Sequence, residues 1–219
     1  MADMEIIDTN SDGDVNPDQG FSRRSFIKGV ISTGAVVSSS NYMFRGSGQL
    51  SAQSSAASVG RLLTVNVNGQ SRRVDVSTQE TLAMTLRYKL GLTGTKIGCD
   101  RAECGSCTVL LDGVPHYGCS VLTHNVRGRQ VTTVEGLEGP DGALHPMQQA
   151  IVDEQGFQCA FCMSGFIMSS VALLSENPNP TRQEAAQALS GNLCRCADYE
   201  KILTSVMRAA EYTREVLDG

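Results

Sequence analysis

The chain has 219 residues, enough for one or two domains, with 18 basic against 23 acidic side chains and a formal charge of −5. No stretch reaches the ~18 uninterrupted apolar residues of a membrane-spanning helix, which excludes an integral membrane span and a transporter. The basic residues are scattered and outnumbered, which argues against a nucleic-acid-binding surface.

Residues 1–58 are predicted to be a leader rather than part of the fold. The first twenty residues carry six acidic side chains and few apolar ones, a composition that predicts disorder. The string SRRSFIK at residues 22–28 is followed by a short apolar run and then by small residues, the three parts of an export signal. It resembles the twin-arginine pattern of bacterial proteins that are exported in folded form. We therefore expect a periplasmic protein, with cleavage near residues 52–57; the alternative is a solvated basic turn before a buried helix.

Residues 59–137 are predicted to form a small α+β domain. Alternating apolar residues on both sides of Asn68-Gly69 predict a β-hairpin over residues 62–76. The string STQE at residues 77–80 has the pattern of a capping box, which predicts a helix start at residue 77 and a left-handed helix stop at Gly91. The remaining predicted elements are a strand at 108–111, a turn at Asp112-Gly113 and short strands to about residue 134.

Residues 138–219 are predicted to form an all-α domain of four helices. A connector rich in Gly, Pro and acidic residues precedes them at residues 136–142. The string TRQE from Thr181 is a second capping box, Asp198 is expected to cap the last helix, and Pro178 and Pro180 interrupt the chain before the third. The predicted helices cover residues 147–154, 164–176, 182 onward, and 199 to about 216.

Eight cysteines fall into two groups of four, and the first 98 residues contain none. The first group has the spacing C-x4-C-x2-C-x11-C, which is the plant-type pattern for a 2Fe-2S cluster. Three closely spaced thiolates let one loop wrap two irons, and a fourth from an adjoining strand closes the site. The second group has the spacing C-x2-C-x31-C-x-C. The predicted metal ligands are Cys99, Cys104, Cys107 and Cys119 in the first group, and Cys159, Cys162, Cys194 and Cys196 in the second.

Zinc and disulfides are the alternative uses of these cysteines. The two C-x2-C pairs resemble halves of a zinc knuckle, but 51 residues separate them and four other cysteines would be unexplained. Disulfides are chemically possible in an exported protein, although they do not predict clustering into two groups. Covalent haem is excluded because Thr108 and Met163, rather than His, follow the C-x2-C pairs.

The segments GCDRAECGSCTV, QCAFCMSGFIM and GNLCRCADYEKI resemble the iron–sulfur subunit of the molybdenum hydroxylases, the xanthine oxidase and aldehyde oxidoreductase family, over about residues 61–217. With its twin-arginine signal the chain is closest in type to the periplasmic aldehyde oxidoreductases. The resemblance implies a plant-ferredoxin-like β-grasp domain followed by a four-helix domain, each with one 2Fe-2S cluster. The family often has Gly at positions 102, 103 and 160, Thr-Pro at 163–164 and Thr-Gly at 197–198, where this chain has Ala102, Glu103, Ala160, Met163-Ser164 and Ala197-Asp198.

The resemblance implies an electron-transfer subunit with no complete active site of its own. Aldehydes or N-heteroaromatics would be oxidised at a molybdenum-pterin cofactor in a large partner subunit, and electrons would reach the second cysteine group, then the first, then FAD in another subunit or the haem of a c-type cytochrome. The resemblance also places Gln158 and Cys196 against the pterin. For Gln158 the alternative is an ordinary loop hydrogen bond.

Other sequence features leave two further functions open. We find no hydrolase, phosphate-binding or dinucleotide motif, and His116, His124 and His145 are isolated, which favours a structural or solvated histidine over a ligand. A stand-alone ferredoxin-like electron carrier is the first alternative function. A zinc- or disulfide-stabilised interaction module is the second.

Overall fold

The computed structural model describes Arg24, Ile27 and Lys28, and then residues 60–139 and 141–218. The predicted leader and twin-arginine signal, residues 1–58, lie outside the described residues apart from those first three, so export stays a prediction. All eight cysteines lie inside the described part of the chain.

The predicted hairpin is confirmed. Strand β1 (Arg61–Val67) pairs with β2 (Gln70–Val76) in antiparallel register. Asn68 and Gly69 connect the strands with φ angles of 52° and 73°. Both residues are left-handed, as the two-residue turn of a twisted hairpin requires, and Asn and Gly adopt this conformation at low steric cost.

Five strands form one mixed sheet in the order β2-β1-β5-β3-β4, in which only β1 and β5 run parallel. Strand β3 (Thr108–Leu111) is central to the packing, because all four of its side chains are buried. Leu110 packs into the core formed by the helices, whereas Val109 and Leu111 face the core on the opposite side of the sheet. The other strands are β4 (Val114–Tyr117) and β5 (Gln130–Thr132).

The first helix starts later than the sequence predicts. Helix α2 (Leu82–Met84) continues directly into the π-helical turn η1 (Thr85–Lys89), and Thr81 caps it by accepting a hydrogen bond from the Met84 N–H. The predicted start at residue 77 is therefore wrong. Glu80 does reach back to the N–H of Ser77 (3.1 Å), as in a capping box, but the segment between them forms a turn. The predicted left-handed stop at Gly91 is confirmed by its φ of 71°.

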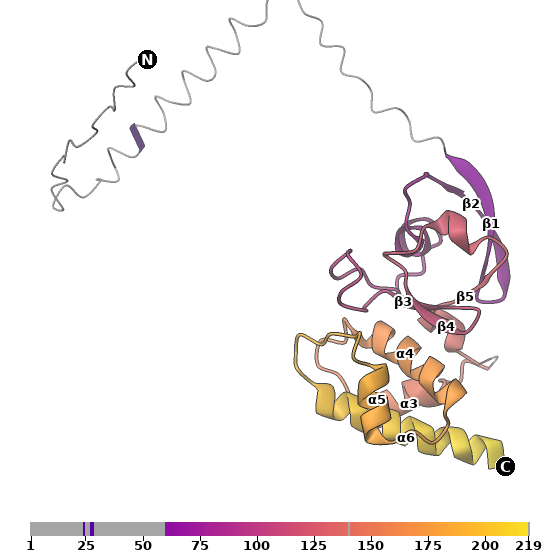
Figure 1. Cartoon of the computed structure of the whole chain (residues 1–219), viewed down its shortest axis with the longest axis vertical. Coiled ribbons are helices and arrows are strands. Elements are labelled where there is room, and N and C mark those ends of the chain that lie inside the picture. The colour runs from indigo at the N-terminus through magenta and orange to yellow at the C-terminus, as the bar shows by residue number, and fades with distance from the viewer. Residues whose placement is uncertain (1–23, 25–26, 29–59, 140, 219) are drawn as a thin grey trace, which may run out of the picture. The chain divides into compact units, whose positions relative to one another are not determined.

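Four helices follow the sheet and cover one of its faces (Figure 1). Thr181 and Glu184 form the predicted capping box of the third helix. The first has a cap that the sequence did not suggest, in which His145 accepts from the Met147 N–H ahead of Pro146. The helices are α3 (Pro146–Asp153), α4 (Met163–Glu176), α5 (Arg182–Ala188) and α6 (Tyr199–Asp218), and two short 3-10 turns, η2 (Thr123–Val126) and η3 (Val134–Leu137), precede them.

Helix α4 lies between the sheet and the other helices. Its Phe166 is 1% exposed and packs with Ile202 and Val206 of α6 in the same core as Leu110 of β3. The sheet and the four helices therefore belong to one compact unit. This mixed fold of a sheet with helices agrees with the expected class, whereas a domain boundary at residues 137–138 stays a prediction.

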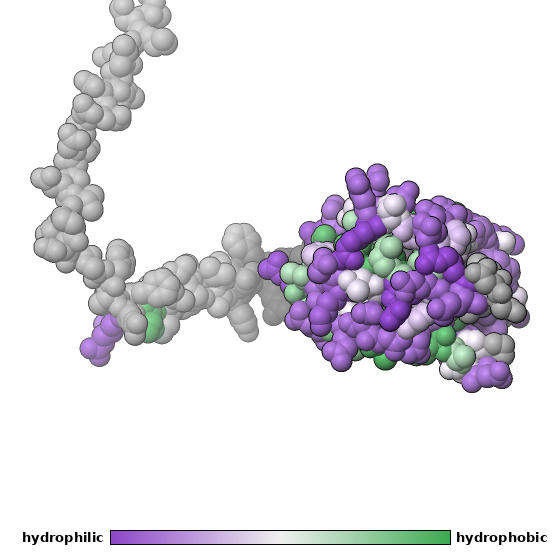
Figure 2. Space-filling view, turned by 90° about the horizontal axis from the view of Figure 1, so that it is seen from below, coloured by the Kyte–Doolittle hydropathy of each residue, from purple (hydrophilic) through white to green (hydrophobic). Residues whose placement is uncertain are grey.

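The surface seen from the helical end is mainly hydrophilic, with hydrophobic residues in small separate groups (Figure 2). Helix α6 explains much of this character, because it buries Ile202, Val206 and Ala210 while Arg208 and Glu211 face outward. None of the helices in the described part of the chain is long and apolar enough to cross a membrane.

Candidate metal centres

The first cysteine group lies in a loop whose backbone N–H groups point at sulfur atoms. Three of its members lie between η1 and β3, and Cys119 follows β4. The N–H of Ala102 donates to Cys119 Sγ (3.3 Å) and the N–H of Cys104 donates to Cys99 Sγ (3.4 Å). Asp100 and Ala102 have φ angles of 52° and 59°, and this left-handed backbone turns the amides inward. The loop is thus shaped to hold negatively charged sulfur.

The second group is formed by the segment before α4 and by the loop between α5 and α6. Cys162 is the last residue before α4, so its buried thiol lies at the positive end of a 14-residue helix dipole. Cys159 precedes it by one tight turn, in which Ala160 has a φ of 58°. Cys194 and Cys196 lie in the loop between α5 and α6, where the N–H of Cys194 donates to the hydroxyl of Tyr199 (2.9 Å).

Each group consists of a buried pair of cysteines and a more exposed pair. The buried pairs are Cys107 with Cys119 and Cys162 with Cys194, all at most 8% exposed. In the exposed pairs, Cys99 lies beside Cys104, and Cys159 lies 3.5 Å from Cys196 between their sulfur atoms. Two cysteines per iron is the ligand number that a 2Fe-2S cluster needs, because bridging sulfides complete each iron. The donor sets therefore fit such a cluster.

Two further observations concern the alternative uses of these cysteines. All eight cysteines are free thiols, so the structure gives no support to the disulfide alternative. Within the described residues, no three His, Cys, Asp or Glu side chains converge on the position of a single ion.

The environments of the thiols differ within each group. Burial raises the pKa of Cys107 and Cys162 to about 12. Partial burial also acts to raise the pKa of Cys99, but hydrogen bonds from the surrounding backbone and from Cys104 outweigh it and lower the pKa to about 7. Metal ligation requires thiolates, so iron binding must displace the protons of Cys107 and Cys162.

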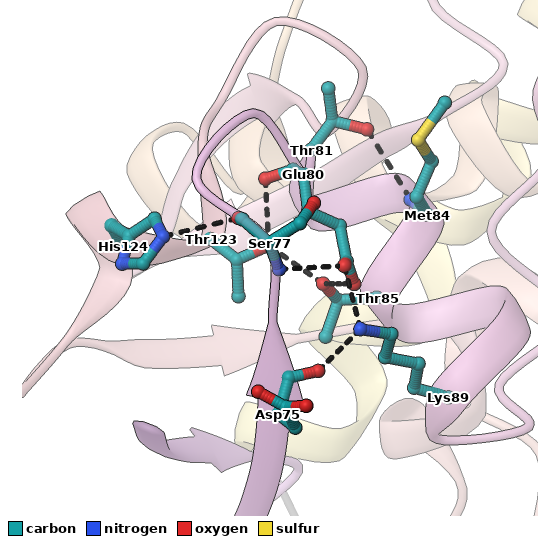
Figure 3. Close-up of polar contacts among 9 residues, drawn as sticks. All are labelled: Asp75, Ser77, Glu80, Thr81, Met84, Thr85, Lys89, Thr123 and His124. Carbon is teal, nitrogen blue, oxygen red and sulfur yellow. Dashed lines mark hydrogen bonds and ion pairs between the residues drawn. The ribbon is translucent and has the colours of Figure 1, made fainter. Parts of the chain in front are cut away.

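A polar network joins Glu80, before the first helix, to Thr123, which follows Cys119 in the chain (Figure 3). The carboxylate of Glu80 accepts from the Thr85 hydroxyl (2.7 Å) and from Lys89 Nζ (2.7 Å), and the backbone carbonyl of Glu80 accepts from the N–H of Thr123 (3.0 Å). Leu82 N–H then donates to the carbonyl of Val121 (2.7 Å). These bonds hold the start of α2 against the segment that follows Cys119.

The two cysteine groups face one cavity of ≈ 410 Å³. Cys99 and Cys104 line it from the first group. Cysteines of the second group line it together with Phe161. The groups are also joined directly, because the N–H of Leu193 donates to the carbonyl of Cys104 (3.0 Å). One hydrogen bond thus connects a residue next to Cys194 with a member of the first group.

The structure shows the surroundings of the other residues for which the sequence suggests a role. Gln158 is exposed next to Cys159, and the structure does not test its predicted contact with a pterin. His145 caps α3, and His124 Nε2 lies 3.2 Å from the carbonyl of Ser77, so these two histidines have structural contacts. Asn192 and Tyr199 are supporting residues that the sequence analysis missed, although both lie within the GNLCRCADYEKI segment.

Two models of known protein families match consecutive parts of the chain. Residues 65–131 match the family model of the 2Fe-2S iron-sulfur cluster binding domain, and residues 133–207 match that of the 2Fe-2S binding domain. The first match contains the first cysteine group and the second contains the second.

Several curated relatives cover most of their own length in this comparison. The nicotine 6-hydroxylase small subunit of Paenarthrobacter nicotinovorans is 47% identical over 67% of this chain and 88% of its own. A nicotinate dehydrogenase subunit of Pseudomonas putida is 44% identical over 70% of this chain and 97% of its own. The aldehyde oxidoreductase iron-sulfur-binding subunit PaoA of Escherichia coli is 44% identical over 68% of this chain and 71% of its own.

Solved structures show the same fold. A chain of quinoline 2-oxidoreductase from Pseudomonas putida is 39% identical, with a TM-score of 0.68 over 71% of this chain and 97% of that chain. Aldehyde oxidoreductase from Desulfovibrio desulfuricans is 40% identical, with a TM-score of 0.67 over 71% of this chain and 17% of that chain. The chain therefore belongs to the family of small 2Fe-2S subunits of the molybdenum hydroxylases.

Proposed function

We propose that this chain is the electron-transfer subunit of a molybdenum-dependent oxidoreductase, with one 2Fe-2S cluster in each cysteine group. The observation that carries the proposal is the pairing of cysteines within two groups that face one cavity and share a direct hydrogen bond. A 2Fe-2S cluster, when bound, supplies one-electron redox chemistry. The protein contributes its ligands, their orientation and their surroundings.

The resemblance to the molybdenum hydroxylases supports a direction of electron flow, and the more exposed cysteines of the second group provide a point of entry. In the second group the exposed pair Cys159 and Cys196 lies at the surface beside Gln158, where a cofactor of another subunit can approach. The first group is reached from the second through the contact between Leu193 and Cys104. We infer that electrons enter at the second group, from a molybdenum-pterin cofactor in a large partner subunit, and leave from the first to FAD or to a c-type cytochrome.

The substrate belongs to the partner, and the relatives support two chemical classes. Their names refer to nicotine, nicotinate and quinoline on one side and to aldehydes on the other. We propose aldehydes or N-heteroaromatics as the substrate class of the complex.

Metal and sulfide analysis tests the cluster content. The proposal requires about four iron and four acid-labile sulfide per chain, and two distinguishable 2Fe-2S signals in the EPR spectrum of the dithionite-reduced protein. Cys196→Ser and Cys104→Ser are matched variants, because each changes a half-buried cysteine of one group. Each should alter one signal and leave the other unchanged. Zinc in place of iron, a single signal at full iron content, or loss of both signals from a folded single variant would refute the assignment.

Purification of the chain with its partners tests the subunit role. We expect a fixed stoichiometry with a much larger subunit that contains molybdenum, and slower reduction of the chain by substrate in Cys196→Ser and Gln158→Ala. Gln183→Ala, at an exposed Gln of α5, is the control. An iron-loaded monomer with no such partner would instead support the stand-alone electron carrier.

We also propose that the protein is exported to the periplasm by the twin-arginine route. The SRRSFIK string with its short apolar run and small-residue tail supports this location. The test is Arg23→Lys combined with Arg24→Lys, which should keep the protein in the cytoplasm. Periplasmic accumulation of the double variant would refute the proposal.

A further inference from the structure

The two cysteine groups meet at a contact formed by three consecutive carbonyl groups of the first loop. The carbonyl of Cys104 accepts from the N–H of Leu193 (3.0 Å), that of Gly105 from the side-chain amide of Asn192 (3.2 Å), and that of Ser106 from the hydroxyl of Ser164 (3.1 Å). The donors come from the α5–α6 loop and from the start of α4, the two segments that carry the second cysteine group. We call these three hydrogen bonds the inter-group contact.

Two glycines allow the backbones to approach this closely. A Cβ atom at Gly165 would overlap the carbonyl oxygen of Gly105. Gly105 itself has a φ of 69°, and a Cβ atom there would collide with the side chain of Asn192. The inter-group contact is therefore a close approach of two backbones that leaves little room for adjustment.

Asn192 is the one residue of this contact whose side chain is held at both ends. Its Nδ2 donates to Gly105, and its Oδ1 accepts from the hydroxyl of Ser169 on α4 (2.8 Å). It is 4% exposed, and Ser169 is 8% exposed. This amide has one favourable orientation, because turning it over would place its Oδ1 acceptor against the carbonyl acceptor of Gly105.

The position of Asn192 in the chain connects this orientation to the metal ligands. The next residue, Leu193, makes the hydrogen bond to Cys104, and the residue after that is Cys194. Gly105, on the other side, lies directly between Cys104 and the segment that leads to Cys107. A displacement of the Asn192 amide would therefore change the separation of the two cysteine groups without touching a sulfur atom.

We propose that Asn192 is a positioning residue for electron transfer between the two cysteine groups, a role that rests on the proposed function. Ser169 orients the amide from α4, and the amide fixes the first loop against the loop of Cys194. The transfer rate falls steeply with separation, so a small displacement has a large effect. Removal of the Asn192 amide should therefore slow electron transfer between the two cysteine groups.

The test uses the iron-loaded subunit in its complex. Asn192→Ala removes both hydrogen bonds, and Ser169→Ala removes only the one that orients the amide. Asn179→Ala is the control, because Asn179 is exposed in the turn before α5. The measurements are the reduction potential of each cluster, the magnetic splitting between the two reduced clusters, and the rate at which the first group is reduced after the second in freeze-quench EPR.

We expect unchanged iron content and potentials in Asn192→Ala, with a smaller splitting and a lower transfer rate than in wild type. Ser169→Ala should show a smaller effect in the same direction, and Asn179→Ala none. Normal splitting and rate in fully loaded Asn192→Ala would overturn the inference, because the amide would then only stabilise the fold. If Asn192→Ala fails to retain iron, Ser169→Ala decides by the same criteria.

Failure of the proposed function gives a different result. Wild-type protein that holds two clusters but receives no electrons from a partner would refute the proposed role, while the splitting in the dithionite-reduced protein would still test the position of Asn192. Wild-type protein without iron would overturn both.

Discussion

Replacing Glu80 with Gln should destabilise the fold through the network that joins Glu80 to Ser77, Thr85 and Lys89 (Figure 3). Glu80 is 8% exposed, and its carboxylate accepts three hydrogen bonds, from the N–H of Ser77, the hydroxyl of Thr85 and Lys89 Nζ. The amide of Gln is similar in size but carries no charge, and in either orientation its NH2 group replaces one of the two accepting oxygens. Glu80→Gln therefore weakens all three bonds at once.

The magnitude follows from the burial of each partner. Hydrogen bonds to a charged group contribute about 1.5–3 kcal/mol each, and part of this is retained by the remaining oxygen. The Lys89 side chain is 37% exposed, so solvent screening reduces its ion pair to about 1 kcal/mol or less. We expect a total loss of about 2–3 kcal/mol at pH 7. For a chain of this length that corresponds to a decrease in Tm of about 5–10 °C.

The loss should depend on pH in a defined direction. Burial acts to raise the pKa of Glu80, but the hydrogen bonds from Lys89, Thr85 and Ser77 outweigh it and hold the pKa below its ordinary value. A lowered pKa in the folded state means that the stabilisation is complete above the pKa of an unfolded Glu, about 4.3, and is lost as the pH falls through the folded value. The difference between wild type and Glu80→Gln should therefore be constant from neutral pH to about 5 and shrink below about 4.

Urea unfolding followed by circular dichroism at several pH values measures this difference. Glu176→Gln, at an exposed Glu at the end of α4, should stay within about 0.5 kcal/mol of wild type throughout. A loss below about 0.5 kcal/mol for Glu80→Gln at pH 7 would refute the reasoning. A loss that persists unchanged at pH 3 would show that packing, rather than the charge, is responsible.

Three further changes test other parts of the structure. Phe166→Ala should cost about 3–5 kcal/mol in urea unfolding because the ring is 1% exposed, and a loss under 1 kcal/mol would contradict the packing of α4. Ala160→Gly should stabilise the protein by up to about 1 kcal/mol, since its φ of 58° is strained for Ala, whereas Ala186→Gly within α5 should destabilise it by about as much; the opposite signs would be a contradiction. Thr181→Ala should lower the free energy of unfolding by about 1 kcal/mol through loss of the cap, and an unchanged value would show that the cap contributes nothing.

Two departures from the family replace Gly with Ala at positions where the backbone is left-handed. Ala102 and Ala160 stand where Gly is common, and both have positive φ angles, of 59° and 58°. Glycine adopts this backbone at no steric cost, whereas in alanine it costs about 1 kcal/mol. The loops nevertheless keep the conformation because hydrogen bonds to sulfur and helix starts determine it on both sides.

Features encoded over a few residues could be predicted from the sequence. The hairpin at Asn68-Gly69, the helix stop at Gly91 and the capping box at Thr181 depend on contacts between near neighbours, so their patterns can be read directly. The grouping of the cysteines also follows from spacing, since three of the first four lie within one loop. The predicted helix start at residue 77 was wrong. The carboxylate of Glu80 also accepts hydrogen bonds from Thr85 and Lys89, and a pattern of four residues does not reveal these partners.

By itself, the sequence predicted which residues would hold iron, because a ligand set is a matter of residue type and local spacing. The tertiary structure decided how the eight cysteines divide into buried and exposed pairs, and how the two groups are held together. The bond between Asn192 and Gly105 joins residues 87 apart in the sequence, and no local pattern encodes such a contact. Burial and long-range hydrogen bonds exist only once the sheet and helices have packed, and those two properties set the separation of the cysteine groups.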